Sequence, residues 1–182
     1  MTNELDRRGF AKAAGAALAG LGMVGAARAR GASEISHTHD AIHQEVAFKA
    51  SPARVYAVLT DATLFDKVVR LSAAMNSSMK TKLGSASTLI EARPGGAIAL
   101  FGGYVTGRNL ELAPDTRLVQ AWRAGSWDPG QFSIAHFALA AGGAGTRLVF
   151  DHTGFPAGQA DHLAEGWHIN YWEPLAKVLA AS

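Results

Sequence analysis

The sequence predicts an α+β fold: a curved antiparallel β-sheet wrapped around a long C-terminal α-helix, with two short helices after the first strand. Two observations support this prediction. The middle of the 182-residue chain is a succession of short segments of alternating polarity, separated by turn residues such as Gly and Pro. The last segment, 161–179, instead has apolar residues at helical spacing, and it is long enough to cover such a sheet.

The first elements of the folded part are a strand and two helices. Apolar and polar residues alternate over residues 42–48, which predicts a half-buried strand. Ser51 and Pro52 are a typical N-cap and first helical residue, and they predict a helix that runs to Leu59. Asp61 is the expected N-cap of a second short helix.

Short strands are expected from residue 73 onward. Because the turns between them are too short for crossover helices, the strands should form an antiparallel meander. The expected strands are residues 73–79, 87–92, 97–101, 104–112, 117–123, 132–139 and 146–152.

The C-terminal helix should place an aromatic stripe against this sheet. Leu163, Trp167 and Tyr171 fall on one helical face. Gly166 is interpreted as a point where the helix backbone approaches a strand closely. Pro174 lies inside the helix, where we expect a kink.

The N-terminal residues predict a twin-arginine export signal. Arg7 and Arg8 are followed by Phe and Lys, and then by an uncharged Ala- and Gly-rich run over residues 13–27. This run is too short and too weakly apolar to span a bilayer. Ala27-Arg28-Ala29 supplies a small-x-small cleavage pattern. The expected organisation is a signal peptide over 1–29, a flexible linker over 30–40 and one domain over 41–182.

Such a leader implies a bacterial protein exported by the twin-arginine route to the periplasm or the medium. Its expected partners there are the export machinery and signal peptidase, and no stable membrane anchor is expected after cleavage. Beyond Ala29 the chain holds as many acidic as basic residues, so nucleic acid is not an expected partner. The chain has no cysteine, which excludes thiol nucleophiles and thiolate-bound metals. No cofactor is expected.

Short motifs follow one another in a fixed order from Gly95 to Leu179. They are Gly95-Gly96, Leu100-Phe101, Thr106-Gly107, Leu112-Ala113-Pro114, Val119-Gln120-Ala121-Trp122-Arg123, Ser126-Trp127-Asp128-Pro129-Gly130, Gly145-Thr146-Arg147-Leu148, His152-Thr153-Gly154-Phe155-Pro156, Gly166-Trp167 and Tyr171-Trp172-Glu173-Pro174-Leu175. Together they resemble the C-terminal domain of the activator of the ninety-kilodalton heat-shock protein ATPase, a branch of the START-like (SRPBCC) superfamily. Residues 42–59 look like the first strand and helix of that family. The resemblance implies a helix-grip fold.

We do not expect this chain to share the function of the chaperone activator that it resembles. The eukaryotic activator, as the resemblance implies, acts in the cytosol and has a further N-terminal domain that binds the chaperone. We expect no room for that domain in this chain, and the predicted leader directs the protein away from the cytosolic chaperone. A shared fold does not imply a shared function.

A ligand cavity is expected where the curved sheet and the C-terminal helix are held apart. Its candidate lining residues are Trp122, Phe137, Phe150, His152, Trp167 and Tyr171. Core packing is the simpler interpretation for the aromatic residues. His152 should point inward at the end of its strand, bonded either to a turn carbonyl or to a ligand. It has no carboxylate partner in sequence, which makes it a poor general base.

His37, His39 and His43 form an H-x-H-x3-H pattern that is the one candidate for a metal site. His37 and His39 fall in the expected linker, so a solvated tail is the simpler interpretation and no metal is expected.

The leading functional hypothesis is an exported, non-catalytic domain that binds an apolar or amphipathic small molecule between sheet and C-terminal helix. An enzyme of the cyclase, aromatase or hydrolase type is an alternative, which the superfamily resemblance implies. It would need a polar group in the cavity, such as His152 with Tyr171 and a carboxylate. The third hypothesis is a protein-interaction module related to the chaperone activator. No motif in the sequence names a reaction.

Overall fold

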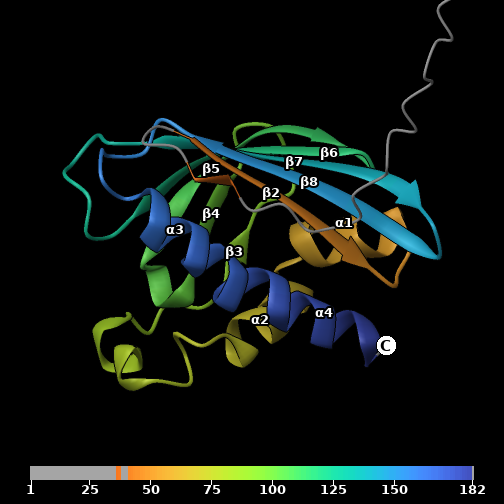
Figure 1. Ribbon diagram of the computed structural model, residues 1–182. Coiled ribbons are helices and arrows are strands. Elements are labelled where there is room, and N and C mark those ends of the chain that lie inside the picture. Colours follow the sequence, from red (N-terminus) through yellow and green to blue (C-terminus); the bar gives the residue numbers. More distant parts are fainter. Residues whose placement is uncertain (1–35, 38–40, 182) are drawn as a thin grey trace, which may run out of the picture. The chain divides into compact units, whose positions relative to one another are not determined.

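The helices lie on one face of an antiparallel sheet (Figure 1). The computed structural model describes residues 36–37 and 41–181, so the predicted leader and most of the predicted linker lie outside the described residues. Within the described part, eight strands follow the order β1-β2-β8-β7-β6-β5-β4-β3, and every neighbouring pair is antiparallel. The predicted α+β class and its antiparallel meander are confirmed.

The sheet and helix bounds are as follows. The strands are β1 (Ser36–His37), β2 (Ala41–Phe48), β3 (Leu89–Ile90), β4 (Ala97–Leu100), β5 (Val105–Ala113), β6 (Arg117–Ala124), β7 (Ser133–Gly142) and β8 (Gly145–Thr153). The helical segments are α1 (Pro52–Thr60), α2 (Ala62–Leu71), η1 (Ser78–Lys82), η2 (Phe101–Gly103), α3 (Ala160–Trp167), η3 (His168–Trp172) and α4 (Glu173–Ala180). In the described residues no helix combines the length and the apolar character needed to cross a membrane.

The two predicted helix caps are present. The Ser51 hydroxyl oxygen accepts the N–H of Arg54 at 3.3 Å, and the Asp61 carboxylate accepts the N–H of Leu64 at 2.8 Å. Each bond satisfies a donor that the first turn of a helix leaves without a backbone partner. Asp61 therefore ends α1 and begins α2 without an intervening loop.

The inner face of the sheet follows the predicted alternation. On β2, Ile42, Gln44 and Phe48 are buried, as the period-two pattern predicted. On β6 and β7, the inward positions include Trp122 and Phe137, also buried. These side chains pack against the C-terminal helical segments, so that sheet and helix share one core.

The predicted strand over residues 73–79 is wrong. This segment forms turns and enters the short helix η1. Polar residues in and just before it bond the local backbone instead: the Ser72 hydroxyl donates to the Val69 carbonyl at 2.6 Å, and the Asn76 amide donates to the carbonyls of Arg70 and Ser72. Such short-range bonds compete with strand pairing.

The predicted strand over 87–92 shortens to Leu89–Ile90. The residues just before it make contacts other than strand pairing. The Ala86 N–H donates to the Gly102 carbonyl at 3.3 Å, and the Thr88 hydroxyl donates to the Asp66 carboxylate of α2 at 2.9 Å. These bonds tie the approach to β3 to η2 and α2.

The C-terminal helix contains a π-helical turn, η3, between α3 and α4. Pro174 has no N–H, and in a regular α-helix its ring would clash with the carbonyl four residues earlier. The wider turn accommodates the proline, and the Glu173 N–H donates to the His168 carbonyl. Tyr171 and Trp172, successive residues in this turn, are both buried. The predicted 161–179 helix is thus present with its irregularity just before Pro174.

The loop before β3 crosses η2 at very close range. A Cβ atom on Gly102 would lie 1.8 Å from the Gly84 carbonyl oxygen, and Gly102 has a φ of +69°. Only glycine fits both the backbone angle and the space.

We expect Gly102→Ala to lower the free energy of unfolding by more than about 1 kcal/mol, because strain at positive φ adds to a backbone clash. Gly95→Ala is the matched control, since Gly95 has a φ of +75° but nothing within 4 Å of a Cβ atom. Urea unfolding of the two variants separates the cost of the backbone clash from the cost of the positive φ. If both variants lost the same free energy of unfolding, the close approach of Gly102 to Gly84 would contribute nothing to the loss.

Candidate functional site

A pocket of about 410 Å³ lies at the α3 end of the C-terminal helical segment. Its lining comes from α3 and η3, from the ends of β5 and β6, from η2, from the loop after β6 and from the segment between α2 and β3. Most of the lining side chains are apolar. A volume of this size lies within the range of small-molecule sites.

The floor of the pocket is aromatic. Trp122 of β6, Trp167 of α3 and Tyr171 of η3 all line it. Their rings pack closely: the centroids of Trp167 and Tyr171 are 4.1 Å apart, and those of Trp122 and Trp167 are 5.6 Å apart. The Trp122 indole N–H donates to the Tyr171 hydroxyl oxygen over 3.4 Å. Burial raises the pKa of Tyr171, so its hydroxyl stays protonated.

One wall of the pocket is the segment that was predicted as a strand. Ala73, Ala74 and Ser77 line the pocket from this side. The Ala74 N–H donates to the Asn170 side-chain oxygen at 2.8 Å, which fixes the segment to η3. Sequence reasoning missed this wall. The available signal was Asn170, an amide beside the apolar face of the helix.

Phe101 forms a strained part of the wall. It lines the pocket with a φ of +51°, a conformation that costs a bulky residue energy. Its ring centroid lies 5.3 Å from that of Tyr171. Packing of the ring holds the unfavourable backbone conformation in place.

The mouth of the pocket is polar. His162 and Glu165 of α3 line it and are exposed to solvent. Tyr104 and Ser126 line the pocket too, and the Tyr104 hydroxyl donates to the Ser126 hydroxyl oxygen at 3.1 Å. The pocket therefore joins an apolar interior to a hydrated rim.

Three of the predicted cavity residues do not line this pocket. Phe137, Phe150 and His152 are at most 2% exposed and belong to the core under the helix. Phe150 packs on Trp167 with a centroid distance of 4.3 Å, and on Phe137 at 5.0 Å. The space under the middle of the helix is thus filled by rings, and the open volume lies toward the start of α3. A ligand-binding role for the six residues stays a prediction.

His152 is held by a complete hydrogen-bond chain. The Trp167 indole N–H donates to His152 Nδ1 at 2.9 Å, and the Ser133 hydroxyl donates to the Trp122 carbonyl at 3.0 Å. Because that hydroxyl proton is used, the 2.6 Å contact between His152 Nε2 and Ser133 Oγ has the histidine as donor. The expected turn carbonyl is therefore replaced by two side chains. Burial lowers the pKa of His152 to about 3, so the ring is neutral.

Gly166 does not have the expected role. No atom lies within 4 Å of a Cβ atom built on it, so the predicted close approach to a strand is wrong. Gly166 instead lines the pocket. The missing side chain leaves open volume beside Trp167.

A second pocket, of about 220 Å³, lies between β2 and the helical segments η3 and α4. The buried polar residue that lines it, Gln44, already has hydrogen-bond partners for its side-chain amide and oxygen. The Gln44 amide donates to the Ala164 carbonyl at 2.9 Å, and its oxygen accepts the Trp172 indole N–H. We place the candidate site in the larger pocket for this reason.

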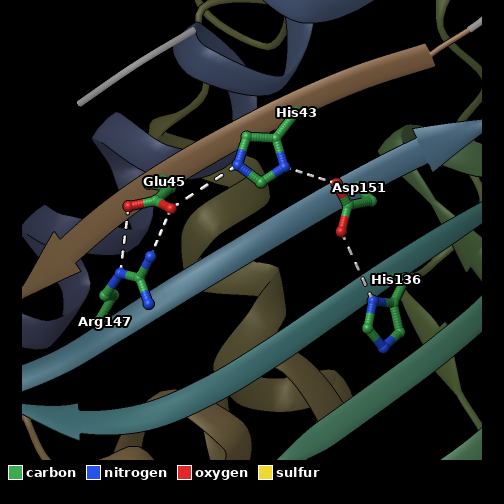
Figure 2. A network of polar contacts seen from close by, with 5 residues as sticks. All are labelled: His43, Glu45, His136, Arg147 and Asp151. Atoms are coloured by element: carbon green, nitrogen blue, oxygen red, sulfur yellow. Dashed lines mark hydrogen bonds and ion pairs between the residues drawn. The ribbon is translucent and has the colours of Figure 1, made fainter. Parts of the chain in front are cut away.

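A network of five ionisable side chains lies on the outer face of the sheet, across β2, β8 and β7 (Figure 2). His43 and Asp151 pair at 2.6 Å across β2 and β8, and the hydrogen bond to Asp151 raises the pKa of His43. Arg147 pairs with Glu45, and His136 approaches the other Asp151 oxygen at 3.9 Å. His136 lies on this outer face, with its side chain 35% exposed. The network lies on the face opposite the core.

The His37, His39 and His43 pattern is only partly described. His43 pairs with Asp151, His37 belongs to β1, and His39 lies outside the described residues. Over residues 36–37 and 41–181, no group of three or more His, Cys, Asp or Glu residues could hold a metal ion.

The family described as "Activator of Hsp90 ATPase homolog 1-like protein" matches residues 49–180. The chain belongs to this family. Among curated relatives, the activator of 90 kDa heat shock protein ATPase homolog 1 of Mus musculus is 27% identical over 131 residues, which are 72% of this chain and 34% of the relative. The homologue of Dictyostelium discoideum is 32% identical over 93 residues, covering 50% of this chain and 24% of the relative. This family member therefore spans about a third of the mouse relative.

Solved structures share its helix-grip fold. An HSP90 activator from Plasmodium falciparum matches with a TM-score of 0.65 at 17% identity, over 78% of this chain and 96% of that one. A protein from Chromobacterium violaceum matches with a TM-score of 0.60 at 22% identity, over 78% of this chain and 98% of that one. At these identities the likeness concerns the fold.

We expect His152 to make the stability of this family member depend on pH. Its pKa of about 3 in the folded state lies below the ordinary histidine pKa of 6.5, so as the pH falls the unfolded chain binds a proton before the folded chain does. Through His152, the free energy of unfolding should therefore fall by about 1.4 kcal/mol for each pH unit as the pH is lowered from roughly 6 to 4.

Urea unfolding at a series of pH values measures this loss. His152→Gln removes the titrating group and should flatten the profile, whereas His162→Gln, at an exposed position, should not. Parallel profiles for the wild type and His152→Gln would contradict the assignment.

Proposed function

We propose that this protein binds an apolar or amphipathic small molecule in the pocket between α3, β6 and η2. The observation that carries the proposal is an open volume of about 410 Å³ above a floor of Trp122, Trp167 and Tyr171. Aromatic rings offer a large apolar area for contact, and Tyr and Trp each add a polar atom. An amphipathic molecule would bury its apolar part on the rings and keep its polar part at the exposed mouth.

The position of the pocket narrows where a ligand can bind between the sheet and the C-terminal helix. A ligand under the middle of the helix would have to displace packed rings, such as Phe150 against Trp167. A ligand at the α3 end meets volume that is already open. We therefore place the ligand beside Gly166 and Tyr171.

Catalysis in this pocket is less well supported. The enzyme hypothesis needs His152 as an available base near Tyr171. Both nitrogens of His152 are occupied by Trp167 and Ser133, and its low pKa gives it little affinity for a proton. Binding without reaction is the function that this geometry favours.

An interaction module remains a weaker proposal. The large exposed apolar side chains among the described residues include Leu71, Leu89 and Leu110, on separate elements, with Phe132 and Ile134 close together near the start of β7. Scattered exposed residues are normal on a protein surface. They give the interaction hypothesis less support than the pocket gives ligand binding.

Gly166→Leu should block the pocket without disturbing the fold. The new side chain meets open space, and replacing a helical glycine favours the helix. We expect the affinity for phenyl-naphthylamine, an uncharged fluorescent probe, to fall at least about tenfold, equivalent to about 1.4 kcal/mol.

Ala180→Leu is the matched control, because Ala180 is an exposed residue at the end of α4 that lines neither pocket. Fluorescence titration compares the variants, and native mass spectrometry of the purified chain looks for a ligand carried from the cell. If probe binding were absent in the wild type, or unaffected by Gly166→Leu, the proposed site would be wrong.

We also propose that the protein works in the bacterial periplasm or medium after twin-arginine export. The support is the sequence of residues 1–29, with Arg7-Arg8 before an uncharged run and Ala29 at the cleavage pattern. The proposed partners in export are the twin-arginine machinery and signal peptidase. Because that route carries folded proteins, a ligand bound in the cytoplasm would travel inside the pocket.

Export depends on the arginine pair in this proposal. Replacing Arg7 and Arg8 together with lysine keeps the charge and removes the guanidinium groups, so uncleaved chain should accumulate in the cytoplasm. Arg28→Lys, outside the pair, should be exported normally. Cell fractionation with immunoblotting measures both, and normal export of the double variant would refute the twin-arginine assignment.

A further inference from the structure

The floor of the pocket has a hydrogen-bond donor to spare. The Trp122 indole N–H donates to the Tyr171 oxygen, which leaves the Tyr171 hydroxyl proton. Toward the side chains and backbone that the structure describes, this hydroxyl donates no hydrogen bond. A buried donor without an acceptor is costly, and a ligand can relieve this cost.

The existing bond at the floor is also a weak one. Its 3.4 Å length exceeds the usual 2.9 to 3.0 Å of an N–H···O bond. The Trp122 N–H keeps this contact with the Tyr171 oxygen, and the Tyr171 hydroxyl proton is the donor that a ligand oxygen can accept.

The charges around the pocket disfavour an ionic ligand group at that floor. Among its described lining residues, the ionisable side chains other than tyrosine are His162 and Glu165, both at the exposed mouth. None of the lining residues whose side chains the structure describes is a lysine or an arginine that could neutralise an anion. A carboxylate at the floor would be desolvated without a cation, and a carboxylate at the mouth would meet Glu165.

We propose that the pocket selects uncharged amphipathic molecules that carry a carbonyl or ether oxygen, and that Tyr171 binds this oxygen at the aromatic floor. This inference rests on the proposed function, because it names the class of ligand for the same pocket. The apolar body of the ligand lies along Trp167, Leu163 and Phe101, all of which line the pocket.

The test compares ligands that differ in one group. A medium-chain methyl ketone, the alkane of equal chain length and the corresponding fatty acid are titrated against bound phenyl-naphthylamine at neutral pH, using the full chain. We expect the ketone to displace the probe about fivefold more strongly than the alkane, the gain of one hydrogen bond. The fatty acid, ionised at this pH, should bind more weakly than the ketone.

Variants assign the preference to a hydroxyl group. Tyr171→Phe should bind ketone and alkane equally, with its alkane affinity unchanged. Tyr56→Phe is the matched control, because Tyr56 lies on α1 and does not line the pocket, and it should keep the wild-type preference. Thermal unfolding confirms that each variant folds.

Each outcome has a distinct meaning. Equal binding of ketone and alkane by the wild type, a preference that survives in Tyr171→Phe, or tighter binding of the fatty acid than of the ketone would overturn the inference while leaving ligand binding intact. Failure of the probe to bind the wild type, by contrast, would overturn the proposed function itself. The wild-type comparison decides the ligand class even where Tyr171→Phe does not fold.

Discussion

Burial of Trp167 against the concave face of the sheet is the contact on which the rest of the structure depends. Its ring packs on Phe150 and Tyr171 at centroid distances of 4.3 and 4.1 Å, and its indole N–H fixes the neutral ring of His152. Through His152 and Ser133, this single side chain is linked to the backbone of β6 at Trp122. A large aromatic side chain contributes several kcal/mol when it is fully buried, more than most single interactions in a domain of this size. The position of α3 over the sheet, and with it the place of the pocket, follows from that contact.

The π-helical turn decides which residues reach the core and which reach the pocket. A regular α-helix turns by about 100° per residue, which would separate Tyr171 from Trp172 on the helix surface. The wider turn before Pro174 lets both be buried: Tyr171 at the pocket floor and Trp172 against Gln44 of β2. π-turns often occur at functional sites, because they reorient a side chain without ending the helix. Here the turn places the one hydroxyl group of the pocket floor.

Local patterns predicted the fold well, and long-range contacts decided where prediction failed. The alternation in β2 and β8, and the caps Ser51 and Asp61, depend on neighbouring residues and could be read from the sequence. The segment after α2 has strand-like polarity too, but it bonds to Asn170, far away in the chain, and becomes a pocket wall. Gly166 was misjudged for the same reason: a glycine signals either a close neighbour or empty space, and only the tertiary structure distinguishes them. Three of the six cavity candidates, Trp122, Trp167 and Tyr171, line the pocket, because inward orientation could be predicted and the filling of the interior could not.

The way the pocket wall is attached has a consequence for the kinetics of exchange. Residues 73–77 are joined to the C-terminal helix through the backbone of Ala73 and Ala74, outside the ladder of the sheet. Because the segment is not part of the sheet, it can open while β2, β8, β7 and β6 stay paired. Local opening of this kind needs much less free energy than global unfolding, so it occurs far more often. We therefore expect opening of this wall to widen the way into the pocket on the timescale of a loop motion, without unfolding of the domain.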